Sequence, residues 1–97
     1  MIVKIHKNNN GQIILAVCDS ELLGKKFEEG KKQLDLSSDF YAGEKRSEKD
    51  VSGLMRNSYI INLVGKKSTG LAIKDGLITQ NNICEICKIP YANCVVG

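Results

Sequence analysis

The chain has 97 residues, a length that fits one domain with a single hydrophobic core. Its hydrophobic content of 42% and charged content of 26% match ordinary globular proteins and exclude fibrous and disordered chains. The 14 Lys and Arg residues exceed the 11 Asp and Glu residues, and the resulting net charge of +3 permits an anionic partner.

The beginning of the chain favours a cytoplasmic protein. Residues 1–7 alternate apolar and polar side chains and lack the apolar stretch of a signal peptide. No run of about 20 apolar residues, long enough to cross a membrane, occurs anywhere in the sequence. In a reducing compartment we expect the four cysteines to be thiols or metal ligands rather than disulfides.

The first two predicted elements form a hairpin. Residues 2–7 alternate as a strand does, and Asn8-Asn9-Asn10-Gly11 suits a tight turn, because Asn and Gly tolerate positive φ. Residues 12–18 then form a nearly continuous apolar run. Such a run indicates a strand buried on both faces, which we place centrally in a sheet covered by helices.

The next segment is more polar. Asp19 opens a helical turn that should end at Gly24, a residue suited to a left-handed cap. Residues 25–38 alternate short apolar positions with charges and predict one or two exposed strands joined at Gly30. Residues 39–46 look like a loop.

Ser47 begins a predicted helix. It precedes Asp50 by three residues, the spacing at which a serine caps a helix and an acid reaches back to the cap. The helix should stop near Asn57. Residues 59–64 are rich in β-branched side chains and too short for a buried helix, so we predict a second buried strand.

The last part of the chain predicts one helix and two strands. Residues 66–75 form the helix, with Gly76 as its left-handed cap. Residues 83–88 and 92–96 look like strands, separated by a turn at 89–91, where Pro90 donates no hydrogen bond.

Together these elements predict a single α/β domain over residues 1–97. Its mixed sheet should hold about five or six strands, with residues 12–18 and 59–64 at the centre and two to three helices outside. No internal repeat is evident.

A glycine loop is the sharpest candidate site. A buried strand passes through glycine into a helix whose first turn carries two lysines and two hydroxyls, a pattern that holds phosphate through free N–H groups and positive charge. The candidate anion- or RNA-binding residues are Gly65, Lys66, Lys67, Ser68 and Thr69. The Walker pattern needs a glycine at position 60, where this chain has isoleucine, so a nucleotide-hydrolase loop is excluded. A solvated, ordinarily capped helix start is the alternative interpretation.

The cysteines are weighed as zinc ligands. Cys84 and Cys87 form a Cys-x-x-Cys pair, with Cys94 nearby and Cys18 distant in sequence. The pair lies in a strand-like stretch without Gly or Pro, and strand alternation would send the two sulfurs to opposite faces. Small buried hydrophobes with free thiols are therefore favoured, and no metal or cofactor is predicted.

Catalytic groups are not apparent. His6, the only histidine, lies on an exposed strand, and Cys18-Asp19 at the end of a buried strand lacks a matched histidine. We name no catalytic residue and favour a protein that is not an enzyme. Paired basic residues offer a surface for phosphates, while an aromatic content of 5% disfavours recognition by base stacking. These pairs are Lys25-Lys26, Lys31-Lys32, Lys45-Arg46 and Lys66-Lys67.

Five stretches carry a family resemblance: Cys18-Asp19-Ser20-Glu21-Leu22-Leu23-Gly24-Lys25, Phe40-Tyr41-Ala42-Gly43-Glu44, Asn62-Leu63-Val64-Gly65, Gly76-Leu77-Ile78 and Ile89-Pro90-Tyr91-Ala92-Asn93. In this order and spacing they resemble the small archaeal family catalogued as domain of unknown function 424, across essentially the whole chain. The resemblance implies an archaeal cytosolic protein without an assigned activity. It also suggests a tie to translation, because such genes can lie near initiation-factor genes.

The chain departs from that family at two positions. Tyr91 stands where many relatives have histidine, and Lys88 where glycine is common, so histidine-based chemistry in that loop is disfavoured. Cys84, Cys87 and Cys94 lie outside the shared pattern, which further disfavours zinc.

The favoured function is a non-catalytic binding module whose partner is RNA or a ribonucleoprotein of the translation apparatus, with no membrane partner. A small protein or enzyme that holds a phosphorylated metabolite at the Gly65 loop is the first alternative. A zinc-stabilised interaction protein is the second. A basic flat face favours RNA, a concave pocket at Gly65 favours a metabolite, and clustered sulfurs favour zinc.

Overall fold

The computed structural model describes residues 1–96 and contains two sheets and two α-helices. The strands of the larger sheet are β1 (Ile2–Lys7), β2 (Ile13–Cys18), β5 (Glu44–Lys45), β6 (Ile60–Val64), β7 (Cys84–Ile86) and β8 (Ile89–Val95). A separate hairpin consists of β3 (Lys26–Glu29) and β4 (Lys32–Asp35). The helices are α1 (Glu48–Arg56) and α2 (Lys66–Lys74), and single 3₁₀ turns lie at Ser20–Leu22 and Gln80–Asn82. The predicted α/β class, with a mixed six-stranded sheet and two helices, is confirmed.

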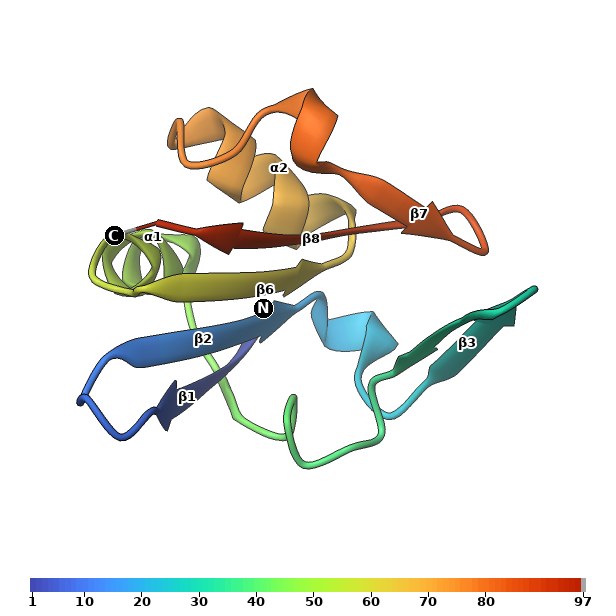
Figure 1. Ribbon diagram of the computed structural model, residues 1–97, viewed down its shortest axis with the longest axis horizontal. Helices are drawn as coiled ribbons and strands as arrows, with labels where there is room; N and C mark the ends of the chain where they lie inside the picture. Colours follow the sequence, from blue (N-terminus) through green and yellow to red (C-terminus); the bar gives the residue numbers. More distant parts are fainter. Residues whose placement is uncertain (97) are drawn as a thin grey trace.

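Strand order in the larger sheet is β5-β1-β2-β6-β8-β7. The β2 and β6 strands lie at its centre, as predicted, and are parallel, whereas every other neighbouring pair is antiparallel. Both central strands therefore end at the same edge of the sheet, on the right in Figure 1. Their register pairs Cys18 with Val64, so the residues that follow, Asp19 and Gly65, are also neighbours.

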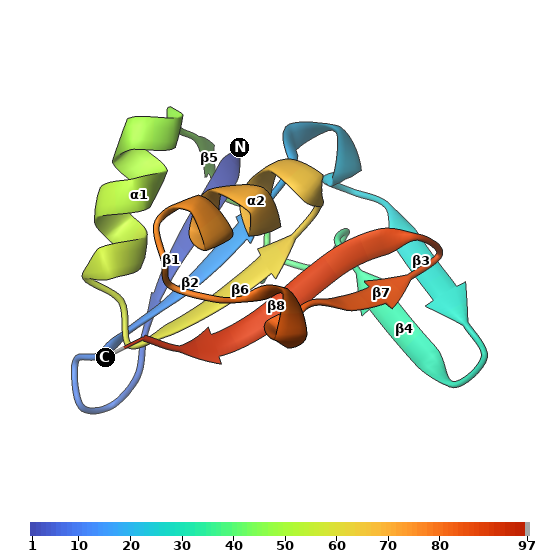
Figure 2. The same ribbon diagram turned by 90° about the horizontal axis from the view of Figure 1, so that it is seen from above.

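Both helices cover one face of the sheet, as Figure 2 shows. Val51 and Met55 of α1 and Leu71 of α2 pack against side chains such as Leu15 and Ile61, which alternate along the central strands. This arrangement makes the main hydrophobic core.

Within the described residues, the opposite face of the sheet is not covered by helices, contrary to the expectation from the sequence. A second core cluster there contains Cys18, Leu36 and Val64, and Phe27 and Leu34 of the β3–β4 hairpin pack against it. The hairpin turns at Gly30, as predicted, and extends beyond the end of the central strands (Figure 1). The central strands are thus covered by helices on one face, and on the other face the hairpin packs against their carboxyl ends at Cys18 and Val64.

The prediction of a turn at residues 89–91 is wrong. The chain reverses instead at Cys87 and Lys88, which have φ angles of 51° and 64°, the positive values that a two-residue hairpin turn requires. Pro90 lies within β8, beside the end of β6, where its carbonyl accepts a hydrogen bond from Gly65 N at 2.8 Å. Because the Gly65 carbonyl is bonded to Thr69, the missing proline N–H leaves no ladder acceptor unpaired.

Residues 39–46, expected to be a loop, include the short strand β5. Its two residues pair with Ile2 and Val3 through backbone groups alone, so no side-chain pattern in the sequence predicts this strand. No helix among residues 1–96 is long and apolar enough to cross a membrane.

Candidate anion-binding site

The five residues predicted to bind an anion divide into two groups. Lys66 and Lys67 are exposed, whereas Ser68 and Thr69 are buried in the first turn of α2 and Gly65 is buried before it. Thr69 Oγ1 donates to the Gly65 carbonyl at 2.8 Å. Only the two lysine side chains of this set are therefore presented to a ligand.

An internal anion already lies at the start of α2. The Asp19 carboxylate, 3% exposed at the end of β2, accepts hydrogen bonds from Lys67 N at 3.0 Å and Ser68 N at 2.8 Å. Ser68 Oγ donates to the same carboxylate at 2.8 Å. Two of the free N–H groups expected at a helix start are thus satisfied, and the negative charge lies at the positive end of the helix dipole.

Gly65 makes this contact possible. Its φ of 110° lies in the region that favours glycine, and a β-carbon at this position would overlap the Asp19 carboxylate. The glycine that the sequence suggested for phosphate therefore admits a carboxylate from the neighbouring strand. The sequence places Asp19 at the start of the turn that ends near Gly24, but its carboxylate makes no cap hydrogen bond there and instead caps α2, 48 and 49 residues along the chain.

A hollow of about 300 Å³ opens beside this cap. Its residues come from the turn after β2, the start of α2 and the start of β8: Asp19, Glu21, Leu22, Gly65, Lys66, Lys67, Ile89 and Pro90. A second hollow of about 290 Å³ adjoins it, shares Lys66 and Pro90, and includes Lys88. The parallel pairing of β2 and β6 explains this location, because ligands in α/β proteins gather at the carboxyl ends of parallel strands.

The lysines around the two hollows form no ion pairs with the described residues. The ion pairs within residues 1–96 are Lys26–Glu28, Arg46–Glu44 and Arg56–Asp75. Lys66, Lys67 and Lys88 take part in none of them. Lys32 of the hairpin reaches the same region, where its Nζ donates to the Glu85 carbonyl at 3.3 Å. These four lysines come from three separate elements, so their proximity is not evident from the sequence.

The cysteines occupy different environments. Cys18 is fully buried, and burial, followed by the charge of Asp19, raises its pKa to about 11. Cys84 and Cys87 are exposed, Cys87 lying in the hairpin turn rather than the predicted strand, and Cys94 is partly buried. Within residues 1–96 no three His, Cys, Asp or Glu side chains are grouped as metal ligands would be.

His6 is held by the loop that follows β4. Its ring stacks on Phe40 with centroids 4.6 Å apart, and Nε2 lies 2.9 Å from the Phe40 carbonyl oxygen. This contact explains the histidine as a support for the loop, far along the sheet from Gly65.

Comparisons with known proteins add the family. The model of the family described as "Protein of unknown function (DUF424)" matches residues 6–96. The chain belongs to this family. That confirms the resemblance stated from the sequence, and it carries no activity with it. No curated protein matches the chain.

One solved structure shares the fold. It is described as the crystal structure of an uncharacterized conserved protein from Methanopyrus kandleri, and it matches 98% of this DUF424 chain and 90% of its own. The TM-score is 0.83 and the sequence identity is 22%. The likeness shows that the architecture is common to both proteins.

Proposed function

We propose that this DUF424 protein is a non-catalytic module that binds RNA, alone or within a ribonucleoprotein of the translation apparatus, in the cytoplasm of an archaeal cell. The binding surface consists of Lys66, Lys67 and Lys88 around the two adjoining hollows. These lysines contact phosphates, which give affinity and salt dependence without reading sequence.

The Asp19 cap is the observation that carries this proposal. A small phosphorylated ligand is best held by preorganised backbone N–H groups, and Asp19 already accepts from two of these at the start of α2. What is left is a spaced set of exposed lysine side chains that form no ion pair within residues 1–96. Such a set suits an extended polyanion, whose successive phosphates can each meet one lysine.

The concave site at Gly65 supports a second candidate, a small-molecule binding protein. Leu22, Ile89 and Pro90 give one side of the hollow an apolar lining, and about 300 Å³ is the lower end of the range for ligand pockets. A ligand there would place its apolar part against these residues and its anionic part beside Lys66.

RNA titration of the double variant Lys66→Ala, Lys67→Ala tests the first proposal. If each lysine meets one phosphate, the affinity for a structured RNA falls on the order of tenfold and the slope of log K against log salt shrinks by about 2. The matched control is Lys49→Ala, Lys74→Ala, which removes the same charge from exposed helical positions elsewhere. Equal losses in both variants would reduce the effect to net charge and overturn the proposal.

Amide NMR spectra separate the two candidates. RNA should shift the signals of residues 65–69 more than those of the turn at 8–11, and rising salt should weaken the effect. A small-molecule site would instead respond to a phosphorylated compound at high salt, with shifts at Leu22 and Ile89.

A further inference from the structure

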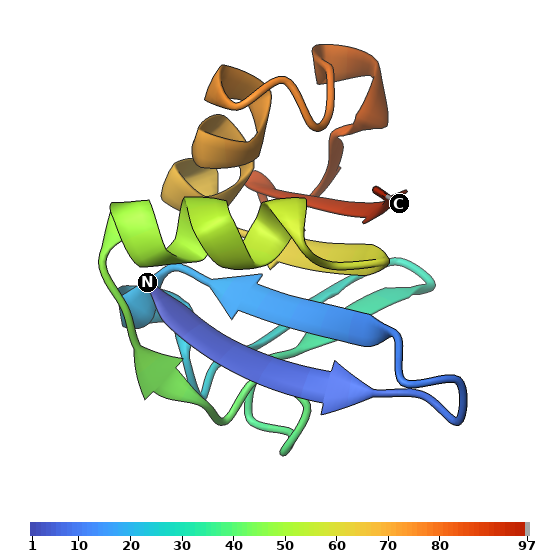
Figure 3. The same ribbon diagram turned by 90° about the vertical axis from the view of Figure 1, so that its left-hand side faces the viewer.

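The outer edge of β1 is only partly paired. The β5 strand meets Ile2 and Val3, while β1 continues to Lys7. Figure 3 shows β1 at the margin of the sheet, with β5 beside only its beginning. More than half of the strand therefore has no neighbouring strand on its outer side within residues 1–96.

Alternation identifies the backbone groups that face outward. In an antiparallel sheet, successive residues of a strand direct their N–H and C=O groups to opposite neighbours. Arg46 N donates to the Met1 carbonyl on the outer side, which assigns the odd-numbered residues of β1 to that side. Val3 meets β5, and the N–H and C=O groups of Ile5 and Lys7 are left facing the open edge.

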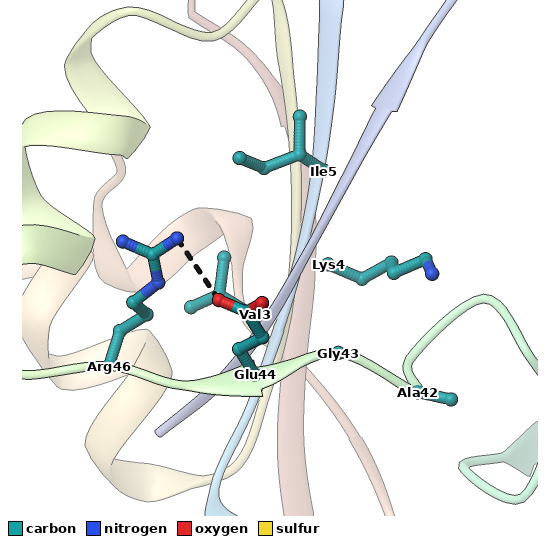
Figure 4. Close-up of a pocket in the computed structure, with 7 residues that line it drawn as sticks. All are labelled: Val3, Lys4, Ile5, Ala42, Gly43, Glu44 and Arg46. Carbon is teal, nitrogen blue, oxygen red and sulfur yellow. Dashed lines mark ion pairs between the residues drawn. The ribbon is translucent and has the colours of Figure 1, made fainter.

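A hollow of about 300 Å³ lies where a longer β5 would continue. The residues drawn around it in Figure 4 are Val3, Lys4, Ile5, Ala42, Gly43, Glu44 and Arg46. At Gly43 the chain passes so close to Val3 that a β-carbon would overlap the Val3 carbonyl oxygen. The residues before Gly43 lie away from the edge, in the loop whose Phe40 contacts His6. The place beside Ile5 therefore stays open.

The charges of this edge are mainly positive. Lys4, Lys7 and Lys45 form no ion pair within residues 1–96, and Arg46 is held by Glu44 at 3.2 Å. Lys4 and Arg46 extend to opposite sides of β1 in Figure 4. A second copy of the chain would bring the same lysines against these, which is how edge lysines prevent self-association. An acidic strand is attracted by the same charges.

We propose that the outer edge of β1 binds an extended acidic segment of a partner protein by strand addition. The segment runs antiparallel to β1 in the place of a longer β5 and exchanges backbone hydrogen bonds with Ile5 and Lys7. Because paired residues share a face, acidic side chains of the segment lie beside Lys4 and His6. An apolar side chain between them covers Ile5, which is 41% exposed.

A capped six-residue peptide of alternating Glu and Val is the probe for this edge. Added to the full chain, it should slow amide hydrogen exchange of Ile5 and Lys7 on the order of tenfold at saturation, because both N–H groups gain acceptors. A Lys-Val peptide of the same pattern should leave both amides unchanged. Equal protection by the two peptides, or protection confined to other residues, would overturn the proposal.

Two variants test the charge and the backbone separately. Lys4→Glu should reduce peptide affinity at least on the order of tenfold, and Lys66→Ala, remote from the edge, should leave it unchanged. Ile5→Pro removes an outward N–H and should also abolish binding; if this variant does not fold, Lys4→Glu decides alone. Unchanged binding in a folded Lys4→Glu protein contradicts the proposal. So does protection of Ile5 without peptide in a sample that sediments as a dimer, which would assign the edge to a second copy.

Discussion

The two α-helices have the same length of nine residues but begin in different ways. At the exposed start of α1, Ser47 Oγ accepts a hydrogen bond from Asp50 N at 3.2 Å, three residues along the chain. At the start of α2, buried Asp19 accepts from backbone groups 48 and 49 residues away. The first cap stabilises one helix, whereas the second also joins the ends of β2 and β6 to α2. A long-range cap is therefore expected to matter more for the stability of the whole domain.

Gly65→Ala should have the largest effect at the start of α2. Alanine at a φ of 110° is strained, and its β-carbon would displace the Asp19 carboxylate, for a combined loss of about 3 kcal/mol in the free energy of unfolding. Urea denaturation measures this loss. Gly76→Ala is the matched control, because its φ of 75° is also positive but nothing lies within 4 Å of the added carbon. A loss there of about 1 kcal/mol gives the strain of a left-handed alanine that meets no other atom, and an equal loss for Gly65→Ala would contradict the overlap.

Asp19→Ala should follow, with a loss of about 2 to 3 kcal/mol, because it leaves the buried Ser68 hydroxyl and two backbone N–H groups without their acceptor. The double variant with Gly65→Ala sharpens the comparison. Once the carboxylate is gone, alanine at position 65 retains only its backbone strain, so the two losses should sum to more than the loss of the double variant. Additive losses would mean that Gly65 and Asp19 act independently.

High pH provides a test beside the same cap. Burial raises the pKa of Cys18 to about 11 from an ordinary value of 9.0, so the folded state keeps its proton longer than the unfolded state does. Stability from this group is fully present below pH 9 and is lost between about pH 9 and 11, by about 2 kcal/mol. Urea unfolding at pH 8 to 10.5 measures how the free energy of unfolding changes with pH. The free energy should fall less steeply with rising pH for Cys18→Ala than for the native chain. The same pH dependence in both proteins would contradict the raised pKa of the Cys18 thiol.

What the sequence predicts well is local or periodic. The two central strands of the sheet, the helix beginning at Ser47 and the hairpin at Gly30 follow from apolar runs, a cap spacing and a glycine, and all three are confirmed. The position of the last hairpin is not predicted, because the chain accepts positive φ at Cys87 and Lys88 rather than at a glycine. Turn chemistry pointed to Pro90, whose missing donor is harmless at the end of the β6 ladder.

The candidate site shows the same limit. Gly65 and the helix start after it are visible in the sequence, and both lie where expected. That Asp19 fills this helix start is a consequence of β2 and β6 being adjacent and parallel, which no local pattern states. The β5 strand depends likewise on backbone pairing with β1. Contacts between segments that are distant in the sequence therefore decide which backbone and side-chain groups of a sequence motif remain available to a ligand.

Ser47→Ala should have the smallest effect and completes the comparison. Loss of an exposed serine cap costs about 1 kcal/mol, because water replaces the hydroxyl as the acceptor of Asp50 N. The loss should appear in urea denaturation together with faster amide exchange at the first turn of α1, while exchange in α2 stays unchanged. Ser47→Asp, which restores an acceptor at the positive end of the helix, should recover native stability. A loss as large as that of Asp19→Ala would show that α1 is tied to the core through its first turn as firmly as α2 is. In that case the separation in sequence between a capping residue and its helix would not determine how much the cap contributes to the stability of the domain.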